Sequence, residues 1–199
     1  MVKQATNLKG TPRDRILEVA TDLFYNQGYR ATGINEVIEK SEVAKATFYN
    51  HFPSKDDLCK ASLEILSENE LSFIDGLIDK AKTPQDKFMS LIKSLDVWAK
   101  DTNYRGCAFI NIAAEIPDEK SPLRKVGTRL YDEIRNRIER LTKELIASDK
   151  ASYGHLDAKT VTDEYFLAFA SATGLIGIYH DIWPVKQAVK SVSRLIGES

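Results

Sequence analysis

The sequence predicts an all-α protein of about nine helices. Apolar residues recur at helical spacing along most of its 199 residues, and no segment shows the alternation of a half-buried strand. Prolines such as Pro12, Pro53, Pro84 and Pro184 stand where a helix would begin or where two helices would be separated. Hydrophobic residues make up 43% of the chain, which is enough to build a buried core.

Composition and charge exclude several classes of protein. No run of about 18 apolar residues is present, so we expect no membrane span. The polar start of the chain lacks the apolar core of a signal peptide. The two cysteines, Cys59 and Cys107, form no CxxC pair, which favours a reduced cytoplasmic setting. Because the net charge is −1, any nucleic-acid binding must come from a local basic patch.

The first predicted helix has clear ends. Thr11 is a good N-cap, Pro12 suits the first helical position, and Asp14 is placed to complete a capping box. Gly28 is a natural residue to end the helix because it tolerates positive φ. The apolar stripe between these ends consists of Ile16, Leu17, Ala20, Leu23 and Phe24.

Residues 34–53 predict a helix-turn-helix motif. A helix at about 33–40, with Thr32 as its candidate N-cap, precedes a turn at 41–42 and a second helix at about 44–51. At about 100° per residue, the second helix has one face for packing and one for solvent. The packing face carries Ala44, Phe48 and Phe52, and the outer face carries Lys45, Ala46, Thr47, Tyr49 and Asn50.

The rest of the chain predicts a larger helical body. Ser54 and Asp57 form a second capping box, and the helix that follows is apolar on more than one face, as expected for a connector between two parts. Thr83 is a candidate cap for the next helix, and residues 149–156 are a polar link. The predicted helices of this body span about 54–81, 83 onward, 105–116, 123–148, 158–182 and 183 onward.

The last two predicted helices favour an oligomer. The helix at 158–182 is apolar nearly all round and rich in alanine and glycine, so we expect burial on both sides. The final helix adds a second apolar stripe. An internal core would explain the same pattern, but for a chain of this size we favour a homodimer formed through these two helices.

From about Thr11 to Leu71 the chain resembles the DNA-binding domain of the TetR (tetracycline-repressor) family. The resemblance is carried by ILEVATDLFYNQGYRAT, by IxxV in the next helix, and above all by VAKATFYNHFPSKDDL. Beyond this region it is limited to the helix count and an RGC segment. The resemblance implies a DNA-binding domain at 11–71 and a ligand-binding and dimerisation domain at 72–199. It also implies a double-stranded operator, a small-molecule effector and repression as the commoner mode.

By position, the recognition helix of the family corresponds to the segment from Lys45 to His51. Two residues depart from the family pattern. Gly33 stands where the family often has a serine or threonine that caps the helix at 33–40, and Glu42 stands where it often has a turn glycine. A positive φ is therefore expected at Glu42, at a cost of about 1 kcal/mol. The residues implied in DNA binding are Lys45, Ala46, Thr47, Tyr49, Asn50, His51 and Lys55.

Side-chain chemistry divides these residues into roles. Lys45 suits guanine acceptors and Asn50 suits adenine, whereas Ala46 and Thr47 permit close approach to a thymine methyl group. Hydrogen bonds to phosphates, expected from Tyr49 and assigned by resemblance to Lys55, fix register but not sequence. Lys3 and Lys9 are further candidates for phosphate contacts, but we favour a frayed tail for residues 1–10.

Candidate ligand-pocket residues lie on the helices that the resemblance assigns to the pocket. Asn111 and Glu115 are one turn apart on an otherwise apolar helix, so each requires a polar partner, either a ligand or a neighbouring helix. Cys107, near Arg105, is either a reactive thiol or a small buried side chain, and we favour the latter. The full set is Trp98, Tyr104, Cys107, Phe109, Asn111, Glu115, Phe166, Phe169 and Thr173.

Other functions are less well supported. The three histidines form no metal-binding spacing, and neither GxSxG nor a P-loop is present, so we expect no enzyme, metal or cofactor. The pair His180-Asp181 is interpreted as a helix-end or interface feature. A regulator of the same fold controlled by a protein partner, or by oxidation of Cys107, is the remaining alternative. The effector, the operator sequence and the target genes are not encoded in any recognisable motif.

Overall fold

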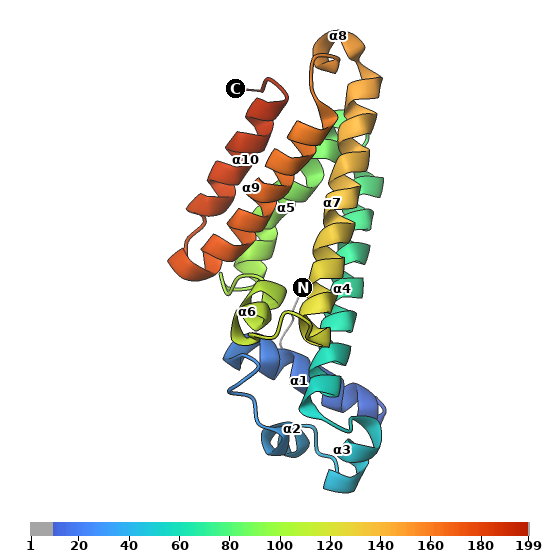
Figure 1. Cartoon of the computed structure of the whole chain (residues 1–199), viewed down its shortest axis with the longest axis vertical. Helices are drawn as coiled ribbons and strands as arrows, with labels where there is room; N and C mark the ends of the chain where they lie inside the picture. The colour runs from blue at the N-terminus through green and yellow to red at the C-terminus, as the bar shows by residue number, and fades with distance from the viewer. Residues whose placement is uncertain (1–9, 199) are drawn as a thin grey trace. The chain divides into compact units, whose positions relative to one another are not determined.

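The computed structural model describes residues 10–198, and every regular element in that span is an α-helix (Figure 1). The predicted all-α class is confirmed, with ten helices in the described residues. None of them combines the length and hydrophobicity needed to span a lipid bilayer. The helices are α1 (Pro12–Gln27), α2 (Ile34–Lys40), α3 (Lys45–His51), α4 (Lys55–Lys80), α5 (Pro84–Asp101), α6 (Ala108–Glu115), α7 (Pro122–Ser148), α8 (Lys150–Tyr153), α9 (Ala158–Tyr179) and α10 (Trp183–Leu195).

The described residues form two compact units. The helix-turn-helix unit comprises residues 10–69 and 108–128, and the bundle unit comprises residues 70–107 and 129–198. Helices α4 and α7 contribute residues to both units. The helix-turn-helix unit therefore includes α6 and the start of α7, which are far from α1–α3 in the sequence.

The predicted caps of α1 and α4 are confirmed. Asp14 N donates to Thr11 Oγ1 at 3.3 Å, and Thr11 N donates back to Asp14 Oδ2 at 3.1 Å, which completes the capping box. At the start of α4, Asp57 N donates to Ser54 Oγ at 3.0 Å. Helix α1 ends at Gly28, which adopts φ 95° and ψ 166°.

The helix-turn-helix motif differs from the prediction at two residues. Thr32 does not cap α2: it is buried, its hydroxyl donates to Gly28 O at 2.8 Å, and Gly33 occupies the N-cap position without a side-chain bond. Ala44 is the exposed N-cap of α3 rather than part of its packing face. Phe48 and Phe52 fill that face and are buried, as predicted. Glu42 adopts a φ of 53°, as expected for the turn.

A carboxylate from α6 holds the loop between α1 and α2. Glu115 Oε1 accepts a hydrogen bond from Tyr29 N at 3.0 Å, and Glu115 Oε2 accepts one from Arg30 N at 2.7 Å. Arg124 of α7 donates to the carbonyl oxygens of Ala113 and Ile116, so the end of α6 is also held. We call the pair of bonds from the loop to Glu115 the Glu115 clamp.

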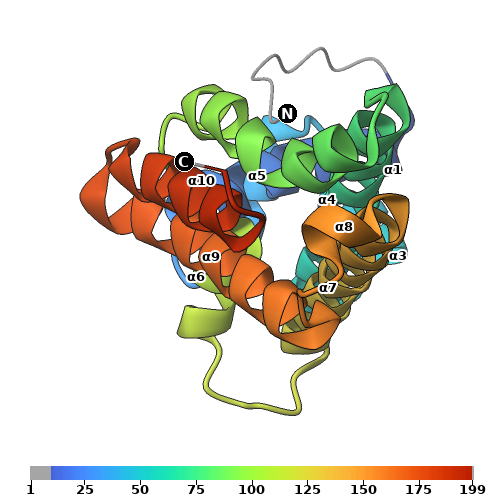
Figure 2. The ribbon, with the colours of Figure 1, turned by 90° about the horizontal axis from the view of Figure 1, so that it is seen from above.

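In the bundle unit, α9 and α10 pack along each other, and α5 packs against both (Figure 2). The phenol of Tyr165, fully buried, donates to Phe88 O at 2.8 Å and accepts from Ile92 N at 3.0 Å. A second close contact joins residues 105–106 to α9, where a Cβ on Gly177 would lie 2.9 Å from Arg105 O.

Two segments of the bundle unit depart from the predicted helix bounds. The helix predicted at 105–116 begins only at Ala108, because the preceding loop contains positive φ values at Asn103, Tyr104 and Gly106. The predicted polar link contains the short helix α8, which Asp149 caps by accepting from the N–H groups of Ala151 and Ser152.

The Glu115 clamp predicts that Gly28 tolerates no side chain. A Cβ at Gly28 would lie 2.5 Å from Glu115 Oε1, and the backbone conformation is one that only glycine adopts readily. We expect Gly28→Ala to lower the free energy of unfolding by about 2–4 kcal/mol in urea denaturation. Gly33→Ala is the matched control, since a Cβ there meets nothing within 4 Å. Equal losses in the two variants would contradict the clamp.

The buried phenol of Tyr165 predicts a second stability effect. Tyr165→Phe leaves Phe88 O and Ile92 N without their shared partner, so we expect a loss of about 1–3 kcal/mol at fixed protein concentration. Tyr153→Phe serves as control because its hydroxyl makes only a 3.4 Å contact to Gln85. A Tyr165→Phe variant as stable as this control would show that α5 satisfies these groups by itself.

Candidate nucleic-acid interface

Helix α3 presents its predicted outer face to solvent. Lys45, Ala46, Asn50 and His51 are exposed, and Tyr49 is 41% exposed. Thr47 is half-buried and lies on the same short helix. The seven predicted DNA-binding residues are thus all at the surface or partly accessible, with Lys55 half-buried at the start of α4.

Helix α3 packs against α1. Phe48 is fully buried, and its ring packs edge-to-face against Tyr49 with centroids 5.2 Å apart. The guanidinium of Arg13 lies 5.5 Å from the centre of the Phe52 ring, a cation–π geometry. Arg15 donates to Glu42 O at 3.4 Å and so contacts the turn between α2 and α3. The orientation of α3 therefore follows from apolar burial and from two arginines of α1.

Lys55 is engaged within the protein. Its ammonium lies 4.5 Å from the centre of the Tyr29 ring, and Nζ donates to Arg30 O at 3.4 Å. The Tyr29 phenol donates to Asp56, and burial together with this carboxylate raises the pKa of Tyr29. These contacts tie the start of α4 to the loop that the Glu115 clamp also holds. A phosphate contact from Lys55 stays a prediction.

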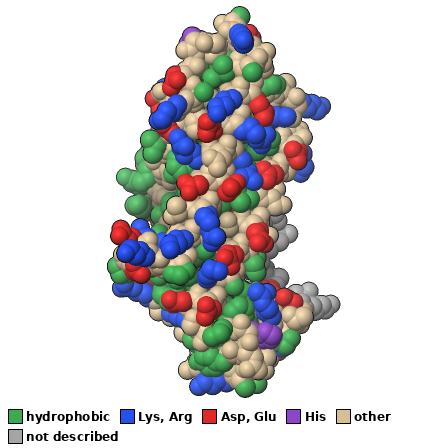
Figure 3. Space-filling model, turned by 45° about the vertical axis from the view of Figure 1, so that its right-hand side comes forward, with side chains coloured by type: hydrophobic (Ala, Val, Ile, Leu, Met, Phe, Trp, Pro, Cys, Tyr) green, Lys and Arg blue, Asp and Glu red, His purple; other side chains and the backbone are tan. Residues whose placement is uncertain are grey.

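Charge elsewhere on the surface is mixed rather than basic. Figure 3 shows acidic and basic side chains interspersed over the face in view. Several are paired one helical turn apart, such as Lys143 with Glu139 at 2.5 Å and Arg140 with Glu144 at 3.1 Å. By contrast, no carboxylate occurs between Val43 and Lys55. The segment that holds α3 therefore carries no negative side chain that would repel a polyanion, although the net charge of the chain is −1.

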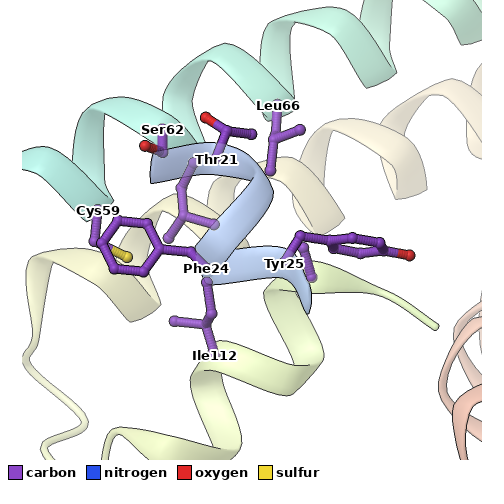
Figure 4. Close-up of a pocket in the computed structure, with 9 residues that line it drawn as sticks. Thr21, Phe24, Tyr25, Cys59, Ser62, Leu66 and Ile112 are labelled. Atoms are coloured by element: carbon purple, nitrogen blue, oxygen red, sulfur yellow. The ribbon is translucent and has the colours of Figure 1, made fainter. Parts of the chain in front are cut away.

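A small recess joins α1, α4 and α6 within the helix-turn-helix unit (Figure 4). In Figure 4 the ring of Phe24 lies against Cys59, while the ring of Tyr25 points the opposite way. The recess holds no space for a water molecule, and burial raises the pKa of the Cys59 thiol to about 12. It is a packed joint with an inert thiol rather than a ligand site. Its lining is Thr21, Phe24, Tyr25, Cys59, Ser62, Leu63, Leu66, Ala108 and Ile112.

Three of the candidate pocket residues belong to the helix-turn-helix unit. Phe109 is buried and packs against Gly127, and Asn111 is half-buried. The sequence indicated that Glu115 needs a polar partner, either a ligand or a part of the protein. In the structure the partner is the loop at Tyr29 and Arg30, whose N–H groups donate to its carboxylate. The structure therefore gives Glu115 a structural role.

The other six candidates belong to the bundle unit, where three of them contact Tyr131, a residue that the sequence did not single out. Tyr131 of α7 donates from its phenol to Cys107 Sγ at 3.4 Å and lies 3.4 Å from Thr173 Oγ1. Its ring also packs edge-to-face on Phe166 at 6.0 Å. The sequence does not mark Tyr131 as a site residue, because it occupies an ordinary position in the amphipathic helix α7. The six are Trp98, Tyr104, Cys107, Phe166, Phe169 and Thr173.

The features considered for catalysis have structural explanations. His180 ends α9 in a left-handed conformation, and its ring packs edge-to-face on Tyr104 at 5.5 Å. Asp181 accepts a hydrogen bond from Trp183 N at 2.8 Å. Within residues 10–198, no group of three or more histidine, cysteine or carboxylate side chains is arranged to hold a metal ion.

Comparison with known proteins identifies the helix-turn-helix unit. Residues 16–61 match the family described as "Bacterial regulatory proteins, tetR family". The HTH-type transcriptional regulator LmrA from Bacillus subtilis is 30% identical over 126 residues, which are 62% of this chain and 67% of the relative. The HTH-type transcriptional repressor DhaR from Mycobacterium sp. is 25% identical over 126 residues, covering 61% of this chain and 60% of the relative.

The fold has close counterparts among solved structures. A TetR-family transcriptional regulator from Streptomyces coelicolor matches with a TM-score of 0.80 at 21% identity, covering 93% of this chain and 94% of that one. The named relatives are regulators of transcription rather than enzymes. The family match includes most of α1 and all of α2 and α3, the helices that hold the exposed outer face of α3. This chain therefore belongs to the TetR family and is a DNA-binding regulator of transcription.

Proposed function

We propose that this regulator is a repressor that binds a palindromic operator as a homodimer and is released by a small molecule. The observation that carries the proposal is the exposed, carboxylate-free outer face of α3, seated on buried Phe48 and Phe52. A short helix enters the major groove only if its outer side chains are small or flexible, and Ala46 and Lys45 meet that condition. A map of bound DNA in the genome, with attention to the neighbourhood of its own gene, tests the proposal most directly.

The homodimer is supported by an exposed apolar surface on α9 and α10. Leu167 is 62% exposed, Ile178 is 75% exposed, and Tyr179 and Trp183 are 55% and 44% exposed. Water contact at so many large apolar side chains on adjacent helices is unfavourable, which favours a second copy of the chain as the cover. A two-fold axis through this surface would present two α3 helices to two half-sites of a palindrome.

Ligand control requires that the effector prefer the state that does not bind DNA. A difference of about 1–3 kcal/mol in binding free energy between the two states is typical of such coupling. The Glu115 clamp supports this part of the proposal, because it joins the end of α6 to the loop that precedes α2. Helix α6 begins directly after Cys107 and ends at Glu115. A displacement of the backbone near Cys107 would therefore move the helix that carries the Glu115 clamp.

Control by oxidation of Cys107 is the second candidate mechanism. The Cys107 thiol is half-buried and accepts a hydrogen bond from the Tyr131 phenol at 3.4 Å. Comparing the release of operator DNA from wild type and Cys107→Ser under oxidants and under small molecules separates the two mechanisms. If Cys107→Ser no longer releases operator DNA under oxidants but still does so under small molecules, the Cys107 thiol is the oxidation sensor.

The DNA-binding surface predicts a selective effect of substitutions on α3. We expect Lys45→Ala and Tyr49→Ala to weaken operator binding, each by about 1–3 kcal/mol, without unfolding the protein, because both side chains are exposed and only Tyr49 has a ring contact, with Phe48. Gel-shift titrations at several salt concentrations provide the measurement. Lys93→Ala is the control, since Lys93 is an exposed lysine of α5. Operator binding by both α3 variants at the wild-type affinity would refute the assignment.

The apolar surface of α9 and α10 predicts a change of assembly. Ile178→Glu would place a charge in the proposed interface, so we expect monomers in sedimentation analysis and a loss of operator binding. Phe73→Glu is the control, because Phe73 is an exposed apolar residue of α4 in the same unit. If Ile178→Glu still sediments as a dimer, another surface must form the contact.

A further inference from the structure

Arg30, in the loop between α1 and α2, has a backbone that the fold holds in place and a side chain that it does not use. Arg30 N donates to Glu115 Oε2 at 2.7 Å, and Arg30 O accepts a hydrogen bond from Lys55 Nζ at 3.4 Å. The side chain is exposed, and within residues 10–198 its guanidinium makes no hydrogen bond or ion pair. The backbone contacts therefore fix where the side chain begins, while its N–H donors remain available.

The other arginines of the helix-turn-helix unit have partners in the protein. Arg13 lies 5.5 Å from the centre of the aromatic ring that follows α3, Arg15 donates to the turn between α2 and α3, and Arg124 donates to two carbonyl groups at the end of α6. In the part of this unit that the structure describes, Arg30 thus differs from them because its guanidinium does not support the fold. An exposed arginine is common at a protein surface, so its position relative to α3 decides whether it has a role.

Lys55 places Arg30 beside the end of α3. Lys55 is four positions after His51, the last residue of α3, so their Cα atoms are at most about 14 Å apart. The major groove of B-DNA is about 12 Å wide and is bordered by the two phosphate backbones. When α3 occupies the groove, Lys55 and the Arg30 carbonyl group that it binds therefore lie near the edge of the groove.

The ammonium of Lys55 already has contacts in this segment. The family resemblance assigns the phosphate contact to Lys55, yet the residue is half-buried and its ammonium lies 4.5 Å from the centre of the Tyr29 ring while it donates to Arg30 O. A phosphate on Lys55 would compete with both contacts. Arg30 has no such contact to lose, and a guanidinium can donate to two phosphate oxygens at once.

The two carboxylates of this segment do not pair with the Arg30 guanidinium. Glu115 accepts hydrogen bonds from the N–H groups of Tyr29 and Arg30. Asp56 accepts the phenolic proton of Tyr29. Both carboxylates repel a phosphate that approaches the loop backbone. A phosphate contact therefore depends on the guanidinium, at the far end of a long side chain.

We propose that Arg30 binds a phosphate group of the DNA backbone at the edge of the groove that α3 enters, and that Lys55 is a positioning residue that acts through the Arg30 carbonyl. The inference rests on the proposed use of α3 as the helix that reads DNA. It adds a contact that neither the helix-turn-helix pattern nor the family resemblance assigns. Because phosphates carry no sequence information, Arg30 contributes to the binding of any DNA duplex.

The salt dependence of DNA binding tests this contact, because each phosphate contact adds about 0.9 to the magnitude of the slope of log K against log salt. The probe is a fluorescein-labelled duplex of random sequence and about 30 base pairs, titrated with the full chain at about 50 to 200 mM KCl. We expect Arg30→Gln to lower the magnitude of the slope by about 0.9 and to weaken binding about fivefold to tenfold at about 100 mM KCl. Arg30→Lys keeps the charge and should keep the slope.

Arg140→Gln is the matched control, since it removes the same charge from an exposed position of α7 and should change neither slope nor affinity. The Arg30→Gln variant should melt at the wild-type temperature, because the backbone bonds of Arg30 do not depend on its side chain. An unchanged slope in Arg30→Gln would overturn the phosphate contact. A clear drop in its melting temperature would show that the side chain supports the fold and would also overturn the proposal.

A double-mutant cycle tests the role given to Lys55. Lys55→Met should weaken binding when Arg30 is present and should have no further effect in the Arg30→Gln background, because its contribution acts through Arg30. Equal weakening in the two backgrounds would show that Lys55 contacts DNA by itself, and its positioning role would then be wrong.

Lys45→Ala in the same titrations separates this inference from the proposed function. If Lys45→Ala weakens binding and Arg30→Gln does not, α3 reads DNA and the contact from Arg30 fails. If Arg30→Gln lowers the slope and Lys45→Ala has no effect, the phosphate contact stands and the proposed recognition surface on α3 fails. Weaker binding by both variants supports both.

Discussion

The Glu115 clamp is the interaction on which the arrangement of the helix-turn-helix unit depends. Two N–H groups at the start of a loop need acceptors, and both find them on one carboxylate from α6. The bond requires close approach, which the absence of a side chain at Gly28 allows. Two further hydrogen bonds join the same loop to α4. The phenol of Tyr29 donates to the Asp56 carboxylate, and the ammonium of Lys55 donates to Arg30 O. The path from α1 to α2 is thus fixed by α4 and α6 together, and the position of α2 and α3 follows from it.

Local chemistry allowed most helix boundaries to be predicted from the sequence. Thr11, Ser54 and Thr83 each cap a helix by a hydrogen bond to the residue three positions later. These bonds are local, so the sequence alone is enough to predict them. The outer face of α3 followed from helical geometry and from the two phenylalanines that must be buried. The prediction for Thr32 was wrong because a tertiary environment buried the hydroxyl and gave it Gly28 O as acceptor.

Contacts between distant residues limited what the sequence could indicate about the sites. Glu115 and Tyr29 are 86 positions apart, so the sequence could show that Glu115 needed a partner but not which one. Tyr131 joins Cys107 and Thr173 across 24 and 42 positions, and nothing in the local pattern of α7 marks it. Burial of α9 on both sides was also expected, yet Leu167 and Ile178 are exposed in the single chain. That difference has a simple explanation if the apolar pattern of α9 records contacts made with a second copy.

Glu115 shows how the environment of a carboxylate gives it a structural role. It is a partly exposed glutamate on a helix with many apolar residues. Its two carboxylate oxygens accept backbone hydrogen bonds from Tyr29 and Arg30, which supply the polar partners that this position requires. Because α6 begins directly after Cys107 and ends at Glu115, a short stretch of chain joins the segment at Cys107 to the carboxylate that holds the α1–α2 loop.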